Sequence, residues 1–223
     1  DRIHLTPEQA QSIGRRIWIN ESGGTVPGLT HWTRGEDFAS LGIAHFIWYP
    51  RGGRGPFVES FTAFLSSLES QGVVLPWWLH GRPSCFWGRR KAFYAGFDSS
   101  LMRELRGFLE ATVEHQARFT ARRLEEALPK MLETLPEAER GTVRARFYRV
   151  AAHPNGVYAL VDYVNFKGEG VSPSERYAGV GWGLLQVLQE MQDTGPGPEA
   201  LDAFSHAAGA VLARRVHYSP PER

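Results

Sequence analysis

The stretch Asn20–Pro50 joins the end of an amphipathic helix to a short β-rich segment through a glycine-containing loop, and this order points to a mixed α+β fold. The helix is expected to begin at Thr6–Gln9, which combines a threonine N-cap, a proline at the first helical position and a glutamine at the third. It should end near Asn20, because Ser22-Gly23-Gly24 stops it. The apolar segment Ser40–Trp48 then predicts a strand.

The rest of the chain is expected to be mostly helical. Apolar residues at helical spacing predict helices over Phe57–Ser70, Leu101–Leu128 (interrupted only at Gly107 and ending near Pro129), Pro136–Val150, Val157–Phe166, Gly181–Met191 and about Glu199–Val216. The segments between them are loops, including Thr25–Phe38 and Pro50–Pro56. We therefore predict one predominantly helical α+β domain over residues 1–223, with a helix plus β-hairpin in 1–56, one small sheet near Ser40–Trp48, and a helical lobe in 57–223.

Composition limits the classes of partner. With 42% apolar and 22% charged residues the chain resembles an ordinary folded protein, and its net charge of +1 gives no reason to expect nucleic acid as a partner. No apolar run reaches the roughly 18 residues that would suggest a membrane span. The chain begins with Asp1 and not Met, so it is either a shortened chain or a mature protein without its signal peptide. We expect export, with a periplasmic or secreted location.

Two carboxylates in the first stretch are candidate catalytic groups. Glu21 follows Ile13 and Ile17 at intervals of four residues, so it extends the apolar stripe of the helix and is expected to point inward. Partial burial would favour the protonated form that a general acid needs. Glu36 is the candidate second carboxylate, with Asp37 as the competing choice. Such a pair is the requirement for glycoside hydrolysis.

The same stretch resembles the phage-type lysozymes. In that family a catalytic Glu ends the first helix, and a Thr-Ile-Gly-Ile-Gly-His hairpin follows an Asp; here the chain has Glu21 and then Ser40-Leu41-Gly42-Ile43-Ala44-His45. Chitosanases of the same superfamily have a similar order. A second segment, Asn165-Phe166-Lys167-Gly168-Glu169-Gly170, resembles the Phe-Asn-x-Gly-x-Gly helix end of these lysozymes. The two segments cover about a quarter of the chain.

The resemblance implies a lysozyme-like fold and assigns roles to several residues. Glu21 matches the general acid, Ser40 matches the Thr that helps hold the attacking water, and His45 matches the His at the end of the hairpin. The chain departs from the family where Ala44 replaces the second hairpin glycine and where a Glu is the candidate second acid, after a longer loop. The region 75–150 has no identifiable counterpart.

Each candidate also has a simpler structural interpretation. Glu21 could bond the glycine turn, Glu36 could be a solvated loop acid, Ser40 could satisfy strand backbone, and His45 is more simply a hydrogen-bonded structural residue. In the second segment, Asn165, Lys167 and Glu169 could cap their helix or contact substrate. Candidate sugar-stacking rings, each of which is more simply a core residue, are Trp32, Tyr163, Tyr177 and Trp182.

Other kinds of site have weaker support. The eight histidines show no His-Glu-x-x-His pairing, so neither a metal nor another cofactor is expected. A Gly-x-Ser-x-Gly nucleophile motif is absent, and the single cysteine, Cys85, is expected to be a buried, inert thiol. The basic run Gly88-Arg89-Arg90-Lys91 is read as solvated surface, with an anion- or substrate-binding patch as the alternative.

These observations predict an exported, bacterial, lysozyme-like hydrolase that degrades a polysaccharide, most simply the peptidoglycan of the cell wall. The alternatives are a chitosanase or other glucan hydrolase, a lytic transglycosylase in which one Glu serves as acid and then base, and a non-catalytic glycan-binding module. The oligomeric state is not indicated, and a monomer is the default expectation.

Overall fold

The computed structural model describes residues 1–220; residues 221–223, which the expected domain includes, lie outside the described residues. The fold is α+β and predominantly helical with small antiparallel sheets, which confirms the predicted class. Two compact units divide the chain: an N-terminal unit, Pro7–Phe119, and a C-terminal unit, Asp1–Thr6 together with the chain from Thr120 onward. Among the described residues, none of the helices is long and apolar enough to cross a membrane.

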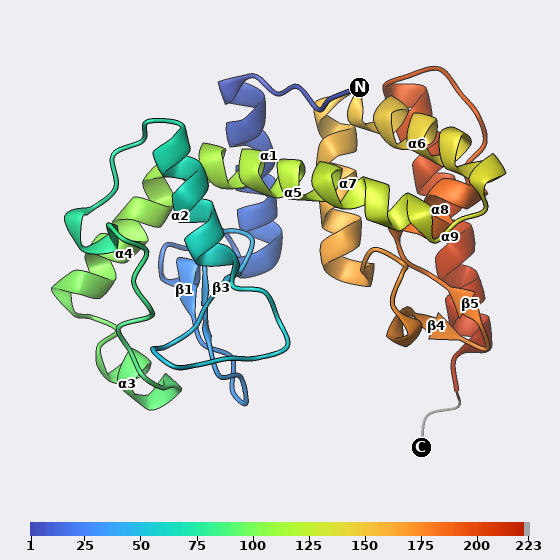
Figure 1. Ribbon diagram of the computed structural model, residues 1–223. Helices are drawn as coiled ribbons and strands as arrows, with labels where there is room; N and C mark the ends of the chain where they lie inside the picture. Colours follow the sequence, from blue (N-terminus) through green and yellow to red (C-terminus); the bar gives the residue numbers. More distant parts are fainter. Residues whose placement is uncertain (221–223) are drawn as a thin grey trace. The chain divides into compact units, whose positions relative to one another are not determined.

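The N-terminal unit combines one three-stranded sheet with short helices (Figure 1). Its elements in chain order are α1 (Pro7–Ser22), η1 (Pro27–Leu29), β1 (Thr30–His31), β2 (Ala39–Leu41), β3 (Phe46–Trp48), α2 (Ser60–Ser70), η2 (Trp77–Leu79), α3 (Arg90–Ala95), α4 (Ser100–Ala111) and the start of α5 (Val113–Glu133). The strands pair antiparallel in the order β1-β2-β3. The two-residue strand β1 and the helix α3 were not expected, because such short elements leave no periodic signal.

An aromatic cluster forms the core of the N-terminal unit. Phe46 of β3 stacks on Phe64 of α2 with ring centroids 5.0 Å apart, and both rings meet Phe119 of α5 edge-on at 5.5 Å. Helix α2 accordingly lies along β3 in Figure 1. This packing places α2 in the same compact unit as the sheet, so the units divide after residue 119, whereas the sequence suggests a division after residue 56.

The segment Ser40–Trp48 forms the β-hairpin expected within residues 1–56, although its apolar composition alone suggests a single strand. Strands β2 and β3 are joined by the four-residue turn 42–45, and Leu41 pairs with Phe46 across it. Gly42 (φ 74°) and His45 (φ 51°) both adopt left-handed backbone conformations, which allow the chain to reverse. A side chain at Gly42 would also collide with the amide of Gln116. The turn therefore requires glycine at this position for two separate reasons.

The long helix expected over Leu101–Leu128 is two helices. It breaks at Thr112 between α4 and α5, where the threonine hydroxyl donates to Phe108 O at 2.9 Å, whereas Gly107 lies inside α4 without interrupting it. Helix α5 also continues through Pro129 to Glu133. Proline removes one backbone hydrogen bond, but the buried side chains beyond it, Met131 and Leu132, keep the apolar stripe of the helix packed.

The C-terminal unit is built from packed helices and a small second sheet that was not expected. Its elements are the rest of α5, α6 (Glu137–Ala151), α7 (Pro154–Lys167), η3 (Pro173–Glu175), β4 (Arg176–Tyr177), β5 (Val180–Gly181), α8 (Leu184–Glu190) and α9 (Pro198–Tyr218). The predicted helices in this region are present with boundaries shifted by a few residues. Helices α6, α7, α8 and α9 pack against one another.

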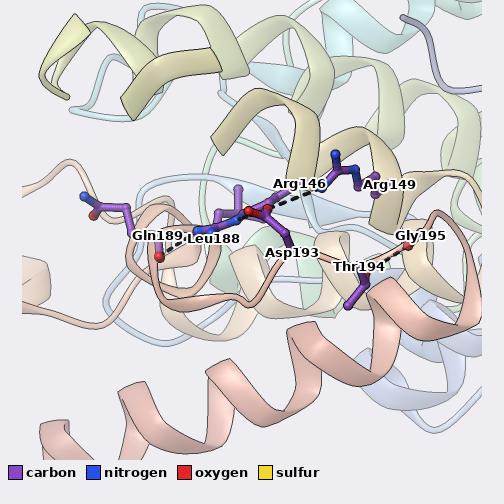
Figure 2. A network of polar contacts seen from close by, with 7 residues as sticks. All are labelled: Arg146, Arg149, Leu188, Gln189, Asp193, Thr194 and Gly195. Carbon is purple, nitrogen blue, oxygen red and sulfur yellow. Dashed lines mark hydrogen bonds and ion pairs between the residues drawn. The ribbon is translucent and has the colours of Figure 1, made fainter. Parts of the chain in front are cut away.

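Arg146 of α6 anchors the end of α8 (Figure 2). Its guanidinium donates to the carbonyls of Leu188 and Gln189 at 3.0 and 2.8 Å, which are among the last carbonyls of α8. The same group contacts Asp193 at 3.0 Å, and Arg149 approaches that carboxylate at 3.3 Å. The pKa of Asp193 is held below its usual value. The hydrogen bond from Arg146 is the main cause, and the positive charges of Arg146 and Arg149 add to it.

Candidate functional site

Glu21 lies in the last turn of α1, at the solvent end of the apolar stripe. Ile13 and Ile17 are buried at 3% and 2% exposure, whereas the Glu21 side chain keeps 28% of its surface exposed. The helix ends here because Gly23 and Gly24 both adopt φ 68°, and their amides bond back to the carbonyls of Ile19 and Trp18. The result is a carboxylate on a rigid helix end, partly shielded yet reachable from solvent.

The β2–β3 turn brings His45 to Glu21. The Nδ1 atom of His45 lies 3.5 Å from Oε2 of Glu21, and the histidine side chain is 38% exposed. These two residues are separated by 24 positions in the chain, and the sequence pattern predicts both of them as site residues. Ser40 belongs to the same hairpin, on β2, and is 8% exposed. The structure thus places Glu21 and His45 in contact, with Ser40 nearby on the hairpin that supports the histidine.

His31 and Tyr94 extend this site, although the sequence pattern does not predict them. His31 pairs with Ser40 across β1 and β2, so their side chains project from the same face of the sheet. Its Nδ1 atom lies 3.2 Å from the hydroxyl of Tyr94 on α3. Partial burial, the nearby charge of His45 and that of Arg90 all lower the pKa of His31. A two-residue strand and a six-residue helix leave no sequence pattern that could have revealed this grouping.

We expect His31 to titrate below the ordinary histidine pKa of about 6.5. Because the pKa of His31 is lower in the native state than in the unfolded state, the unfolded chain binds more protons at acidic pH. The contribution of His31 to the free energy of unfolding is therefore fully present above about pH 6.5 and is lost as the pH falls through the native pKa. In His45→Gln the repulsion from His45 disappears, and the pKa of His31 should rise towards its ordinary value. NMR titration of the imidazole resonances measures the pKa of His31 in the wild type and in His45→Gln. An unchanged His31 midpoint in this variant would show that His45 does not act on it.

Glu36 lies in an open depression of about 650 Å³ in the N-terminal unit. Its backbone carbonyl accepts a hydrogen bond from Nε1 of Trp32 at 2.8 Å, while its side chain is exposed, as is that of Asp37. Trp32 also lines the depression but is only 2% exposed and meets Phe93 edge-on, so it belongs largely to the core. Glu21 is not part of this lining.

Two separate sets of contacts lie near the two carboxylates of the N-terminal unit. The first joins Glu21 to His45; the second begins with His31 and the Tyr94 hydroxyl, and the charge of His45 acts on His31 without a direct contact. The guanidinium of Arg90 lies 4.6 Å from the centre of the Tyr94 ring, and its Nε donates to Trp32 O at 2.9 Å. Arg90, Trp32 and Glu36 then share the depression.

The aromatic candidates of the C-terminal unit are largely buried. Trp182 is 6% exposed, and the Tyr163 hydroxyl donates to its carbonyl at 2.6 Å. Burial raises the pKa of Tyr163 to about 12. Tyr177 packs on Trp182 with ring centroids 4.4 Å apart, and the guanidinium of Arg215 lies 4.8 Å from the Trp182 ring. Tyr177 is the ring of this group that retains more exposure.

The polar candidates of the C-terminal unit lie where α7 ends. Asn165 is exposed on the last turn, and burial followed by repulsion from Arg215 lowers the pKa of Lys167. The next residues pack tightly against the start of α8, because Leu184 N donates to Gly168 O and Leu185 N to Glu169 O, both at 3.0 Å. Burial and then repulsion from Glu175 raise the pKa of Glu169.

Other kinds of reactive group are not assembled in the part of the chain that the structure describes. No group of three or more His, Cys, Asp or Glu side chains there could hold a metal ion. Cys85 is buried, and this burial raises its thiol pKa to about 12. A thiolate nucleophile at neutral pH is therefore disfavoured at Cys85.

Comparison with known proteins leaves the site to be judged on its own geometry. No protein-family model matches this chain, and no curated protein or solved structure matches it significantly.

Proposed function

We propose that this protein is a glycan-cleaving enzyme with a lysozyme-like fold, in which Glu21 is the general acid. The observation that carries the proposal is the contact between Glu21, on the last turn of α1, and His45, in the hairpin turn that follows. The order of helix end, loop and hairpin is the order in which the chain resembles the phage-type lysozymes, and here it brings the two matched side chains within 3.5 Å.

In the proposed reaction Glu21 protonates the oxygen that links two sugars as the glycosidic bond breaks. The carboxyl group is held on a rigid helix end with 28% of its surface exposed, so it is positioned and still accessible. His45 is within reach of the carboxylate and orients it. Ser40, on the strand that leads into the turn, is the proposed partner of the attacking water.

Glu36 is the proposed second carboxylate, with Asp37 as its neighbour and rival in the same depression. A separation of about 6.5–9.5 Å from Glu21 in the substrate complex would give inversion, and about 5–5.5 Å would give retention. A lytic transglycosylase reaction is the second candidate, and the exclusion of Glu21 from the depression that holds Glu36 favours it. In that route Glu21 acts as acid and then as base.

Peptidoglycan is the proposed substrate, by resemblance alone, with chitosan as the nearest rival, and export to the periplasm or beyond is the proposed location. In the C-terminal unit, Asn165, Lys167 and Glu169 are proposed glycan contacts of that unit on the same basis. Tyr177 and Trp182 are the candidate stacking rings, of which Trp182 is buried at 6% exposure.

Incubation with peptidoglycan sacculi, chitosan, chitin oligomers and β-glucans tests the proposal, with products identified by mass and anomeric configuration. Cleavage of one of these glycans is the expected result, and an anhydro product would assign the transglycosylase route. Binding without cleavage of any of them would contradict an enzymatic function.

A further inference from the structure

The depression beside Glu36 has a strongly basic lining. Its cationic side chains are Arg51, Arg54, Arg89, Arg90 and Lys91. Glu36 and Asp37 supply its carboxylates, so five positive and two negative groups leave a formal charge of +3, whereas the whole chain has a net charge of only +1. The positive charge is therefore concentrated locally, although the total composition conceals it.

Two links between distant segments build this basic lining. Cys85 N donates to Tyr49 O at 2.9 Å, and an isolated bridge pairs Pro50 with Cys85, so the loop that contains Arg51 and Arg54 starts beside the segment that leads into α3. The hydrogen bond from Arg90 Nε to Trp32 O then ties α3 to the segment that contains Glu36. These two links bring the segments that carry the cations to the same depression.

The five cations of this basic lining are not held in ion pairs. Of the ion pairs among the described residues, none involves the five cations of the depression. Arg90 is held by a backbone carbonyl and by the Tyr94 ring, neither of which neutralises it. Because the five cations outnumber the two carboxylates of the depression, they repel one another, and a bound anion relieves that repulsion. Guanidinium groups also bind phosphate and carboxylate groups through paired hydrogen bonds.

We propose that this basic depression binds a ligand that carries two or more phosphate or carboxylate groups. Its volume of about 650 Å³ lies within the range of small-molecule sites. Three exposed arginines of the lining, Arg51, Arg54 and Arg89, provide forked donors from two segments of the chain. The proposal goes beyond glycan cleavage and does not depend on it.

Calorimetric titration of the whole protein with pyrophosphate and with trigalacturonate tests the proposal, and the uncharged sugar chitotriose serves as the neutral probe. We expect one of the two anions to bind with an affinity that falls as salt is added. The stronger of the two identifies the anionic group as phosphate or as the carboxylate of an acidic saccharide. The proposal is overturned if neither anion binds with a dissociation constant of about 1 mM or lower, which corresponds to a binding free energy of about −4 kcal/mol.

The double variant Arg54→Gln/Arg89→Gln should weaken anion binding about tenfold or more, because each arginine contributes charge-assisted hydrogen bonds. The matched control, Arg15→Gln/Arg103→Gln, removes two exposed arginines from the same unit that do not line the depression. Thermal unfolding of both variants verifies that each is folded. If both double variants weaken anion binding equally, the loss reflects the lower overall charge of the protein, and the proposal of a defined site is refuted.

Discussion

Glu21→Gln is expected to lower kcat for glycan cleavage by about 10²–10⁴-fold, the usual contribution of a general acid. Glutamine has nearly the shape of glutamate but cannot deliver the proton that the leaving oxygen needs. Glu21 is partly exposed and its ion-pair partner is a single histidine at 3.5 Å, so the fold should tolerate the change. Glycan binding should persist, because the sugar contacts do not require the proton.

The measurement is the steady-state rate on the glycan that the wild type cleaves, with thermal unfolding and glycan binding recorded in parallel. Glu69→Gln is a matched control, since Glu69 is an exposed carboxylate near the end of α2 in the same unit. Its rate should equal that of the wild type. If Glu21→Gln retains full activity in a folded protein, Glu21 has no part in the chemistry and the proposed function loses its general acid.

Gln116→Leu is expected to produce a large loss of stability. Gln116 is fully buried; its Oε1 accepts the amide of Ile43 at 2.9 Å, and its Nε2 donates to Leu109 O at 2.6 Å and to the Thr112 hydroxyl. Leucine fills the space but leaves the buried Ile43 amide without the partner that Gln116 supplies, whereas Leu109 O still accepts from the amide of Thr112. A buried group left unsatisfied costs about 1–3 kcal/mol, so the free energy of unfolding should fall by about that amount.

Urea denaturation measures this loss as a lower midpoint with an unchanged m-value. Because Gln116 holds the turn that positions His45, the fraction that remains folded should also cleave glycan more slowly. Gln71→Leu is the control: Gln71 is an exposed residue at the end of α2, and its side-chain hydrogen bonds go to Ser67, one turn earlier. Its effect should stay within about 0.5 kcal/mol. A comparable loss in both variants would remove the special role assigned to the Gln116 network.

The amino-acid sequence was sufficient for features that depend on local order. The helical spacing of Ile13, Ile17 and Glu21 and the Ser22-Gly23-Gly24 stop placed the carboxylate at the end of α1, because periodicity and glycine conformation act within a few residues. The same reasoning identified most of the helices and the α+β class. It could not separate α4 from α5 at Thr112, where the break depends on a side-chain bond and on packing rather than on a helix-breaking residue.

Only the tertiary structure decided which distant residues lie close together. Three contacts join segments whose sequences give no sign of the pairing. They are the contact of His45 with Glu21, the pairing of His31 with Ser40 across β1 and β2, and the contact of Tyr94 with His31. The basic depression arises in the same way, from segments joined by the backbone hydrogen bond from Cys85 to Tyr49 and by the side-chain hydrogen bond from Arg90 to Trp32 O. Local propensity is a property of neighbouring residues, whereas these groupings follow from how buried side chains such as Phe46, Phe64 and Gln116 pack in three dimensions.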